Sequence, residues 1–141
     1  MNDLTGKPSY KGENNHYLRL INQVLSEQPD LELAILIGSQ TDNSADQNSD
    51  WDIAIRWTKQ IIKMQRLGKT ESLRRLLAKQ LNLPETKIDL IDLTSVNLAM
   101  KAIVAEDGVI LKGGDSLAWN YFLQRTWYEL EKHYWDTIYA T

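Results

Sequence analysis

The chain contains no cysteine among its 141 residues. A disulfide framework and a thiolate metal site are therefore both excluded. Long hydrophobic runs are missing as well, since no apolar stretch is long enough to span a bilayer. Residues 1–12 are polar and lack the apolar core of a secretory signal. Together these absences predict a cytoplasmic protein that does not act at a membrane.

An excess of positive charge is also lacking. The chain has 16 Lys and Arg against 19 Asp and Glu, a net charge of -3, which argues against broad nucleic-acid binding through a basic face. Its two histidines, His16 and His133, stand far apart, so a surface or core role is favoured over metal binding. With 43% hydrophobic and 25% charged residues, the composition is that of an ordinary globular chain. We expect one domain over residues 1–141, with no direct nucleic-acid partner.

Apolar periodicity and turn residues predict an α/β fold, of the α+β kind, in which a small mixed sheet of about four strands is flanked by helices. The strand at 31–37 is almost continuously apolar, so both of its faces should be covered. Further strands are predicted at 50–57, 87–93 and 109–111. After a loose lead-in at 1–13, a first helix is capped by Asn14 or Asn15, and the stretch at 58–67 is ambiguous but more helical. Further helices are predicted at about 70–81, at 94–106 with Thr94 as cap, and at 115–140 with Asp115 or Ser116 as cap.

The centre of the sequence is the apolar strand that ends in Gly38-Ser39, followed by ten residues and then Asp50-Trp51-Asp52. Side chains alternate along a strand, so Asp50 and Asp52 point to one face while Trp51 and the following apolar residues point to the core. Glycine lets a ligand approach the backbone closely. Ser39 can cap a short helix whose free N–H groups suit a phosphate.

A third carboxylate follows in the segment 87–93. If Ile88 and Leu90 face the core, Asp89 shares the open face with Asp50 and Asp52, and Asp92 points away. Oxygen ligands suit Mg²⁺, and two ions about 3.5–4 Å apart can clamp the attacking and leaving oxygens of a phosphoryl transfer. Each feature taken singly is common in solvated strands and turns. Their combination favours a site for phosphate chemistry.

The segment GSQTDNSADQNSDWD resembles the G-S-x10-D-x-D signature of the DNA polymerase β-like nucleotidyltransferases, and IDLIDL resembles their third-acid strand. The resemblance covers residues 14–111 and, more loosely, the terminal helix. The small size is similar to that of the minimal nucleotidyltransferases (MNT), which are antitoxin partners of HEPN ribonuclease toxins. The resemblance implies that Gly38 and Ser39 hold the triphosphate of ATP, and that Asp50, Asp52 and Asp89 bind two Mg²⁺ ions.

The chain departs from that pattern after Gly-Ser. Many relatives carry an arginine there, whereas this chain has Gln40, and its loop adds Asp42 and Asp46 without any glycine. The loop itself therefore neutralises a triphosphate less well. Compensating charge could come from Arg56, which shares the carboxylate face by parity, or from Lys87, although a solvated or ion-paired surface role is slightly favoured for both residues.

The predicted terminal helix is unusually aromatic. At 100° per residue its apolar residues form two stripes, whereas one stripe is enough to dock a surface helix on its own core. Tyrosine and tryptophan are common at interfaces, so a partner surface is one interpretation, and a helix buried deeply in its own domain is an equally supported one. If one stripe is exposed for a partner, we expect it to be the one with Tyr128, Trp135 and Tyr139. The stripes are Leu117, Tyr121, Tyr128, Trp135 and Tyr139 on one side, and Leu123, Trp127, Leu130, Tyr134 and Ile138 on the other.

Three functions follow as hypotheses. By resemblance, the first is an Mg²⁺-dependent enzyme that transfers AMP from ATP to a tyrosine hydroxyl of a cognate HEPN toxin and so neutralises it. The second is a non-catalytic antitoxin that blocks the toxin sterically through the terminal helix. The third is a nucleotidyltransferase acting on a small molecule such as an aminoglycoside. Enzymes of that third kind usually carry an extra substrate-binding domain, which this chain lacks.

Overall fold

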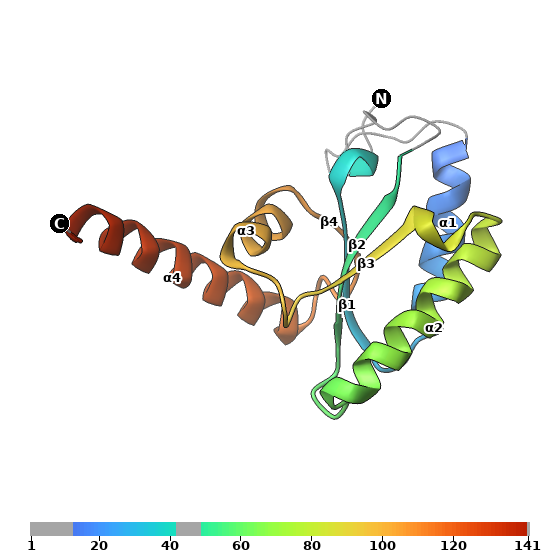
Figure 1. Cartoon of the computed structure of the whole chain (residues 1–141), viewed down its shortest axis with the longest axis horizontal. Coiled ribbons are helices and arrows are strands. Elements are labelled where there is room, and N and C mark those ends of the chain that lie inside the picture. The colour runs from blue at the N-terminus through green and yellow to red at the C-terminus, as the bar shows by residue number, and fades with distance from the viewer. Residues whose placement is uncertain (1–12, 42–48, 141) are drawn as a thin grey trace.

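The computed structural model describes residues 13–41 and 49–140, which form a four-stranded sheet with helices on both faces (Figure 1). The predicted fold class is confirmed. Across these ranges, no helix combines the length and apolarity that a membrane crossing requires. The elements are α1 (Glu13–Ser26), β1 (Leu31–Ile37), the 3-10 turn η1 (Gly38–Thr41), β2 (Trp51–Trp57), α2 (Lys63–Leu81), the 3-10 turn η2 (Glu85–Lys87), β3 (Ile88–Asp92), α3 (Leu98–Asp107), β4 (Val109–Lys112) and α4 (Leu117–Tyr139).

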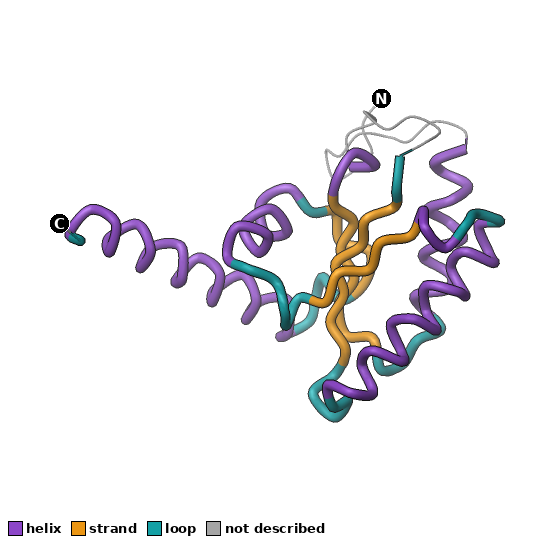
Figure 2. The backbone as a smooth tube through the Cα atoms, in the orientation of Figure 1, coloured by secondary structure: helices purple, strands orange, loops and turns teal. Residues whose placement is uncertain are grey.

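The sheet is mixed, with the strand order β3-β2-β1-β4. The strand β1 runs antiparallel to β2 and β4, while β2 and β3 run parallel. Helices α1 and α2 cover one face, and α3 and α4 lie on the other (Figure 2). Consequently β1 is buried on both faces, as its continuous apolar run predicts: Leu36 belongs to the core under α1 and α2, and Ile35 to the core under α3 and α4.

Two predicted helix starts are wrong. Asn14 and Asn15 lie inside α1, so neither caps it. Thr94 does not begin α3 either, because its backbone N–H and its hydroxyl both donate to Asp92 Oδ1, at 2.9 and 2.6 Å. Asn97 caps α3 instead, and its Oδ1 accepts from the backbone N–H of Met100 at 2.9 Å. Several polar residues in a row could cap each helix, and only the tertiary contacts select one.

The second half of the ambiguous stretch, residues 63–67, and the predicted helix at 70–81 form one helix, α2, whereas residues 58–62 are not helical. Asn82 ends the helix in the left-handed conformation, with φ 55°. The stretch looked ambiguous because the first turn of α2 is mostly exposed and shows no clear apolar stripe: Met64 and Leu67 are 81% and 68% exposed.

The long helix α4 packs on the sheet only through its first turns. Ser116 caps it and accepts from the N–H of Trp119. The buried residues are Trp119, Phe122 and Thr126, which belong to neither predicted stripe. The C-terminal half projects away from the body of the molecule (Figure 1). The stripe that includes Trp135 is exposed, as predicted. The expectation that the other stripe packs on the core is wrong for Trp127, Tyr134 and Ile138, which are exposed, whereas Leu123 and Leu130 are half-buried.

Candidate active site

The three predicted acidic residues lie at one end of the sheet, where β1 ends and β2 and β3 begin. Asp52 stands opposite Ile37 of β1 and opposite Asp89 of β3 in the register of the sheet. Asp50 is exposed directly before β2, and Asp89 is exposed on β3. Trp51 and the alternate residues of β2 are buried on the other face, so the predicted parity of the strand is confirmed.

Asp52 and Asp89 are register partners on the neighbouring parallel strands β2 and β3. The pKa of the Asp52 carboxyl is raised, first by burial, then by the charges of Asp89 and Asp50, and finally by hydrogen bonding to the Asp89 side chain. A charged Asp52 is therefore disfavoured by its surroundings, and a bound cation would offset that effect.

Gly38 lies against Asp52. Its φ is +81°, in the left-handed region that favours glycine, and a Cβ at this position would stand 2.5 Å from Asp52 Oδ2. Glycine is thus required here because a side chain would collide with the Asp52 carboxylate. The sequence alone did not reveal this reason. Ser39 lies inside the 3-10 turn η1, and the Thr41 hydroxyl closes the turn by donating to the Gly38 carbonyl at 2.7 Å.

The two residues that could supply compensating positive charge, Lys87 and Arg56, lie in different parts of the structure. Lys87 Nζ lies 3.9 Å from Asp50 Oδ1, at the rim of the acidic site. Arg56 does share the face of Asp52, but it lies four residues further along β2, where its Nε is 3.5 Å from Glu32 Oε2. It is therefore a half-buried, ion-paired residue away from the acidic site. Asp42 and Asp46 fall in residues 42–48, outside the described part of the chain.

The donor chemistry of the acidic site fits a magnesium ion, because it offers only carboxylate oxygens. Among the described residues, no three His, Asp or Glu side chains form a ready metal-binding group. The structure brings Asp52 and Asp89 together, while Asp50 acts on Asp52 through its charge. The metal assignment of all three residues stays a prediction.

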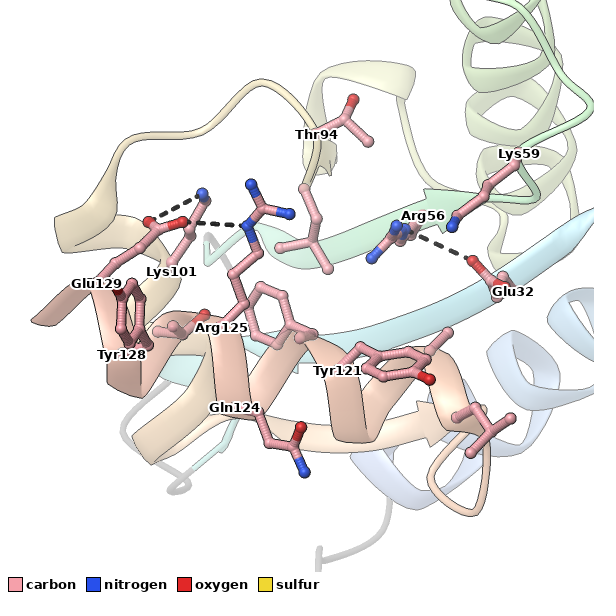
Figure 3. Close-up of a pocket in the computed structure, with 15 residues that line it drawn as sticks. Glu32, Arg56, Lys59, Thr94, Lys101, Tyr121, Gln124, Arg125, Tyr128 and Glu129 are labelled. Atoms are coloured by element: carbon pink, nitrogen blue, oxygen red, sulfur yellow. Dashed lines mark hydrogen bonds and ion pairs between the residues drawn. The ribbon is translucent and has the colours of Figure 1, made fainter.

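A second feature, at the far end of β2, was not anticipated from the sequence. A cavity of about 1070 Å³ opens between the ends of β2 and β3, α3 and the first half of α4 (Figure 3). It is lined by charged residues from positions 32 to 129, a separation that no sequence motif could have connected. Arg56, Lys101 and Arg125 are among them, the uncharged Tyr121 also lines the cavity, and Figure 3 shows these side chains around the opening.

The family model described as "Polymerase beta, Nucleotidyltransferase" matches residues 19–116. No curated protein matches the sequence. Among solved structures, the chain is similar to a toxin–antitoxin crystallised with AMP-PNP, at 26% identity and a TM-score of 0.64, over 87% of this chain and 93% of that one.

Two further structures share the fold. One is a tri-AMPylated Shewanella oneidensis HEPN toxin in complex with MNT antitoxin, with 23% identity, a TM-score of 0.60, and 90% of this chain and 93% of that one covered. The other is the toxin–antitoxin MntA–HepT, with 24% identity, a TM-score of 0.55, and 91% and 92% covered. At these identities the two likenesses establish a common fold and no more.

Proposed function

Because this chain belongs to the polymerase β nucleotidyltransferase family, we propose that it is an antitoxin enzyme that transfers AMP from ATP to a tyrosine hydroxyl of a HEPN toxin. The observation that carries the proposal is the placement of Asp52 beside Asp89 on neighbouring strands and beside Gly38, at the end of the sheet where β1 stops. In a fold of this family, such an acidic pair is suited to hold Mg²⁺, which would bind a nucleotide triphosphate next to the glycine turn.

The choice of ATP is supported by the relative that was crystallised with AMP-PNP. The turn that contains Gly38 and Ser39 leaves β1 beside Asp52, so a triphosphate bound along its backbone would present the α-phosphate to the acidic pair. Lys87, beside Asp50, supplies positive charge at the rim where Gln40 replaces an arginine.

The proposed reaction is a single displacement. The tyrosine oxygen attacks the α-phosphorus, a new P–O bond forms, and the bond to the β-phosphate breaks as pyrophosphate leaves. Asp89, the more exposed member of the acidic pair, accepts the tyrosine proton. When bound, Mg²⁺ would neutralise charge on the phosphoryl oxygens, and Asp50, Asp52 and Asp89 are the residues that would hold it.

The choice of a protein acceptor is supported by α4. Its C-terminal half presents large aromatic side chains to solvent, and Trp135 stacks on Tyr139 with ring centroids 5.6 Å apart. Aromatic residues of this kind commonly anchor protein interfaces. The AMPylated HEPN toxin in the related complex supports a toxin as the acceptor.

The same aromatic surface favours a second candidate function, a steric antitoxin. The exposed half of α4 projects away from the sheet (Figure 1), so it could hold a toxin without any chemistry at the acidic pair. The two functions differ in whether neutralisation depends on the carboxylates.

The test combines the chain with a candidate HEPN toxin, ATP and Mg²⁺, followed by intact-mass spectrometry of the toxin. We expect mass gains of whole AMP units with the native chain and none with Asp50→Asn. If Asp50→Asn still neutralises the ribonuclease activity at stoichiometric amounts, steric inhibition is sufficient. If it binds but fails to neutralise, nucleotide transfer is the antitoxin activity.

A further inference from the structure

The cavity between β2, β3, α3 and α4 is here called the basic pocket (Figure 3). It is lined by Arg56 near the C-terminal end of β2, whereas Asp52 of the acidic pair lies near the start of that strand. Arg56 at its edge and Asp52 at the acidic site are four residues apart on the same strand, or about 13 Å at the rise of a β-strand. The helix α3 lies along the same face of the sheet. The basic pocket is therefore separate from the site of the proposed chemistry.

The charge of the basic pocket opposes that of the whole chain. Four cations line it against two carboxylates, whereas the chain has a net charge of -3. The excess of positive charge is thus a local property of this cavity, which makes it attractive to an anionic ligand. The cations are Arg56, Lys59, Lys101 and Arg125, and the carboxylates are Glu32 and Glu129.

The ion pairs within the basic pocket are long. Glu129 is shared between two cations, with its Oε2 3.4 Å from Lys101 Nζ and its Oε1 3.4 Å from Arg125 Nε. Arg56 Nε is 3.5 Å from Glu32 Oε2. Strong charge-assisted hydrogen bonds between nitrogen and oxygen measure about 2.7–2.9 Å. The cations therefore keep donor capacity for an incoming carboxylate.

The walls of the basic pocket lead onto α4. Tyr121 and Tyr128 line it and are 64% and 67% exposed, while the buried Leu93 and Phe122 lie beneath them. Both tyrosines belong to the same helical stripe as Trp135, so the pocket is continuous with the exposed aromatic half of α4. A ligand in the pocket could thus belong to a protein that also covers this helix.

We propose that the basic pocket docks an acidic segment of the protein that accepts the nucleotide, at a distance from the reacting atoms. This inference rests on the proposed function and adds to it the chemistry by which the acceptor is recognised. A protein segment fits better than a nucleotide because the pocket runs onto an aromatic helix surface. Since docking takes place about 13 Å from Asp52, it controls the affinity for the acceptor and leaves the chemical step unchanged.

The test uses two pairs of charge reversals with equal change in net charge. The first is Lys59→Glu with Arg125→Glu, both exposed at the basic pocket. The matched control is Lys79→Glu with Arg19→Glu, both exposed on α2 and α1 at the other face of the sheet. The probe is a fluorescein-labelled peptide with six glutamates around one tyrosine, compared by anisotropy with its all-glutamine counterpart.

We expect the native chain to prefer the glutamate peptide, and the pocket pair to weaken its binding by about tenfold or more while the control pair changes it less than about twofold. Because Arg125→Glu places a like charge four residues from Glu129, Lys59→Glu alone is a second variant outside any helix, for which we expect about a threefold loss. No preference for glutamate, or an equal loss in the control pair, overturns the proposal. If ATP displaces the peptide from the native chain and this effect of ATP is lost in the pocket pair, the pocket is a nucleotide site. That outcome overturns the proposal as well.

Failure of this proposal is distinguishable from failure of the proposed function. With the acceptor protein, the pocket pair should raise KM about tenfold at unchanged kcat, whereas Asp52→Asn should lower kcat and leave peptide binding intact. If the pocket pair transfers nucleotide normally at low acceptor concentration, the docking role is overturned and the proposed function is not. If the native chain transfers nothing, the proposed function fails while the peptide result stands.

Discussion

The two ends of β2 carry opposite charges on the same face of the sheet. At one end Asp52 meets Asp89 of β3, and the pKa of its carboxyl is raised by burial and by its acidic neighbours. At the other end Arg56 pairs with Glu32 and borders the basic pocket. Alternation along the strand assigns both residues to one face and cannot separate them. Their neighbours in the sheet decide their roles.

The acidic end is built by strand pairing. Because β2 and β3 are parallel neighbours in register, Asp52 and Asp89 lie side by side although 37 positions separate them in the chain. The basic end is built by helices, since α3 and α4 bring Lys101 and Arg125 over the strand ends. Under the proposed function, the sheet would carry the chemistry and the helices that cover it would carry the recognition.

The largest effect expected is the loss of transfer in Asp52→Asn. Removing one carboxylate of the acidic pair should remove several kcal/mol of charge stabilisation from the reaction, which corresponds to at least about a 100-fold loss of rate. Pyrophosphate release measures it, and gel filtration with the partner should show that binding is retained. Full activity would exclude the acidic end as the site of chemistry.

The next largest loss of transfer should come from Gly38→Ala, which tests how closely the position of Asp52 is defined. The new Cβ would stand 2.5 Å from Asp52 Oδ2 in a backbone with φ +81°, so the carboxylate must shift and transfer should fall by about tenfold or more. The control is Gly68→Ala in α2, where a Cβ meets nothing within 4 Å. We expect it to stabilise the helix by about 1 kcal/mol with transfer unchanged. Equal activity in both variants would refute the steric role of Gly38.

The recognition side is tested with Trp135→Ala. If exposed α4 anchors the partner, this truncation should cost about 2 kcal/mol of binding, more than tenfold in Kd, while the protein melts normally and still binds ATP. The matched control is Trp119→Ala, because Trp119 is buried and stacks on Phe122; we expect it to lose about 3–5 kcal/mol of stability. Unchanged partner affinity in Trp135→Ala would move the interface elsewhere.

The smallest effect expected is a pH-dependent gain of stability in Asp52→Asn. Because the pKa of Asp52 is raised from its ordinary value of 3.8, the folded chain binds more protons than the unfolded chain just above that value, and stability falls as pH rises through the window. At pH 7 the variant should therefore melt above the native chain, and the difference should vanish below pH 3.8. Calorimetry across pH measures this.

The control for that experiment is Asp92→Asn on the same β3 segment. Asp92 pairs with Arg66 at 3.4 Å and accepts two hydrogen bonds from Thr94, so its neutralisation should lower the melting temperature at pH 7. A gain of stability in both variants would indicate a general effect of net charge and would contradict the specific strain at Asp52.

Much of the acidic end could be predicted from the sequence because its signals are local. The strand at 31–37 was predicted with its observed bounds, and the parity of Asp52 and Asp89 follows from apolar neighbours that must face a core. The end of α2 at Asn82 has an equally local reason, because asparagine tolerates positive φ. The role of Arg56 could not be predicted, because Glu32 lies on the neighbouring strand and pairs with it only after folding.

The aromatic helix shows the limit of periodicity. A stripe identifies residues that can be buried together, but α4 has 23 residues and measures about 34 Å, longer than the sheet face on which it packs. Only its first turns therefore find a core, and Trp119 and Phe122 are buried although neither lies in a predicted stripe.

By itself, the sequence determined the fold class, the central strand, and the face on which Asp50, Asp52 and Asp89 lie, since alternation and turn chemistry act between near neighbours. Tertiary structure alone decided that Asp52 touches Asp89 and Gly38, that Arg56 stands apart from them, and that four cations from distant segments line one cavity. The physical reason is that strand register and helix packing set distances between residues far apart in the chain, and charges interact according to distance.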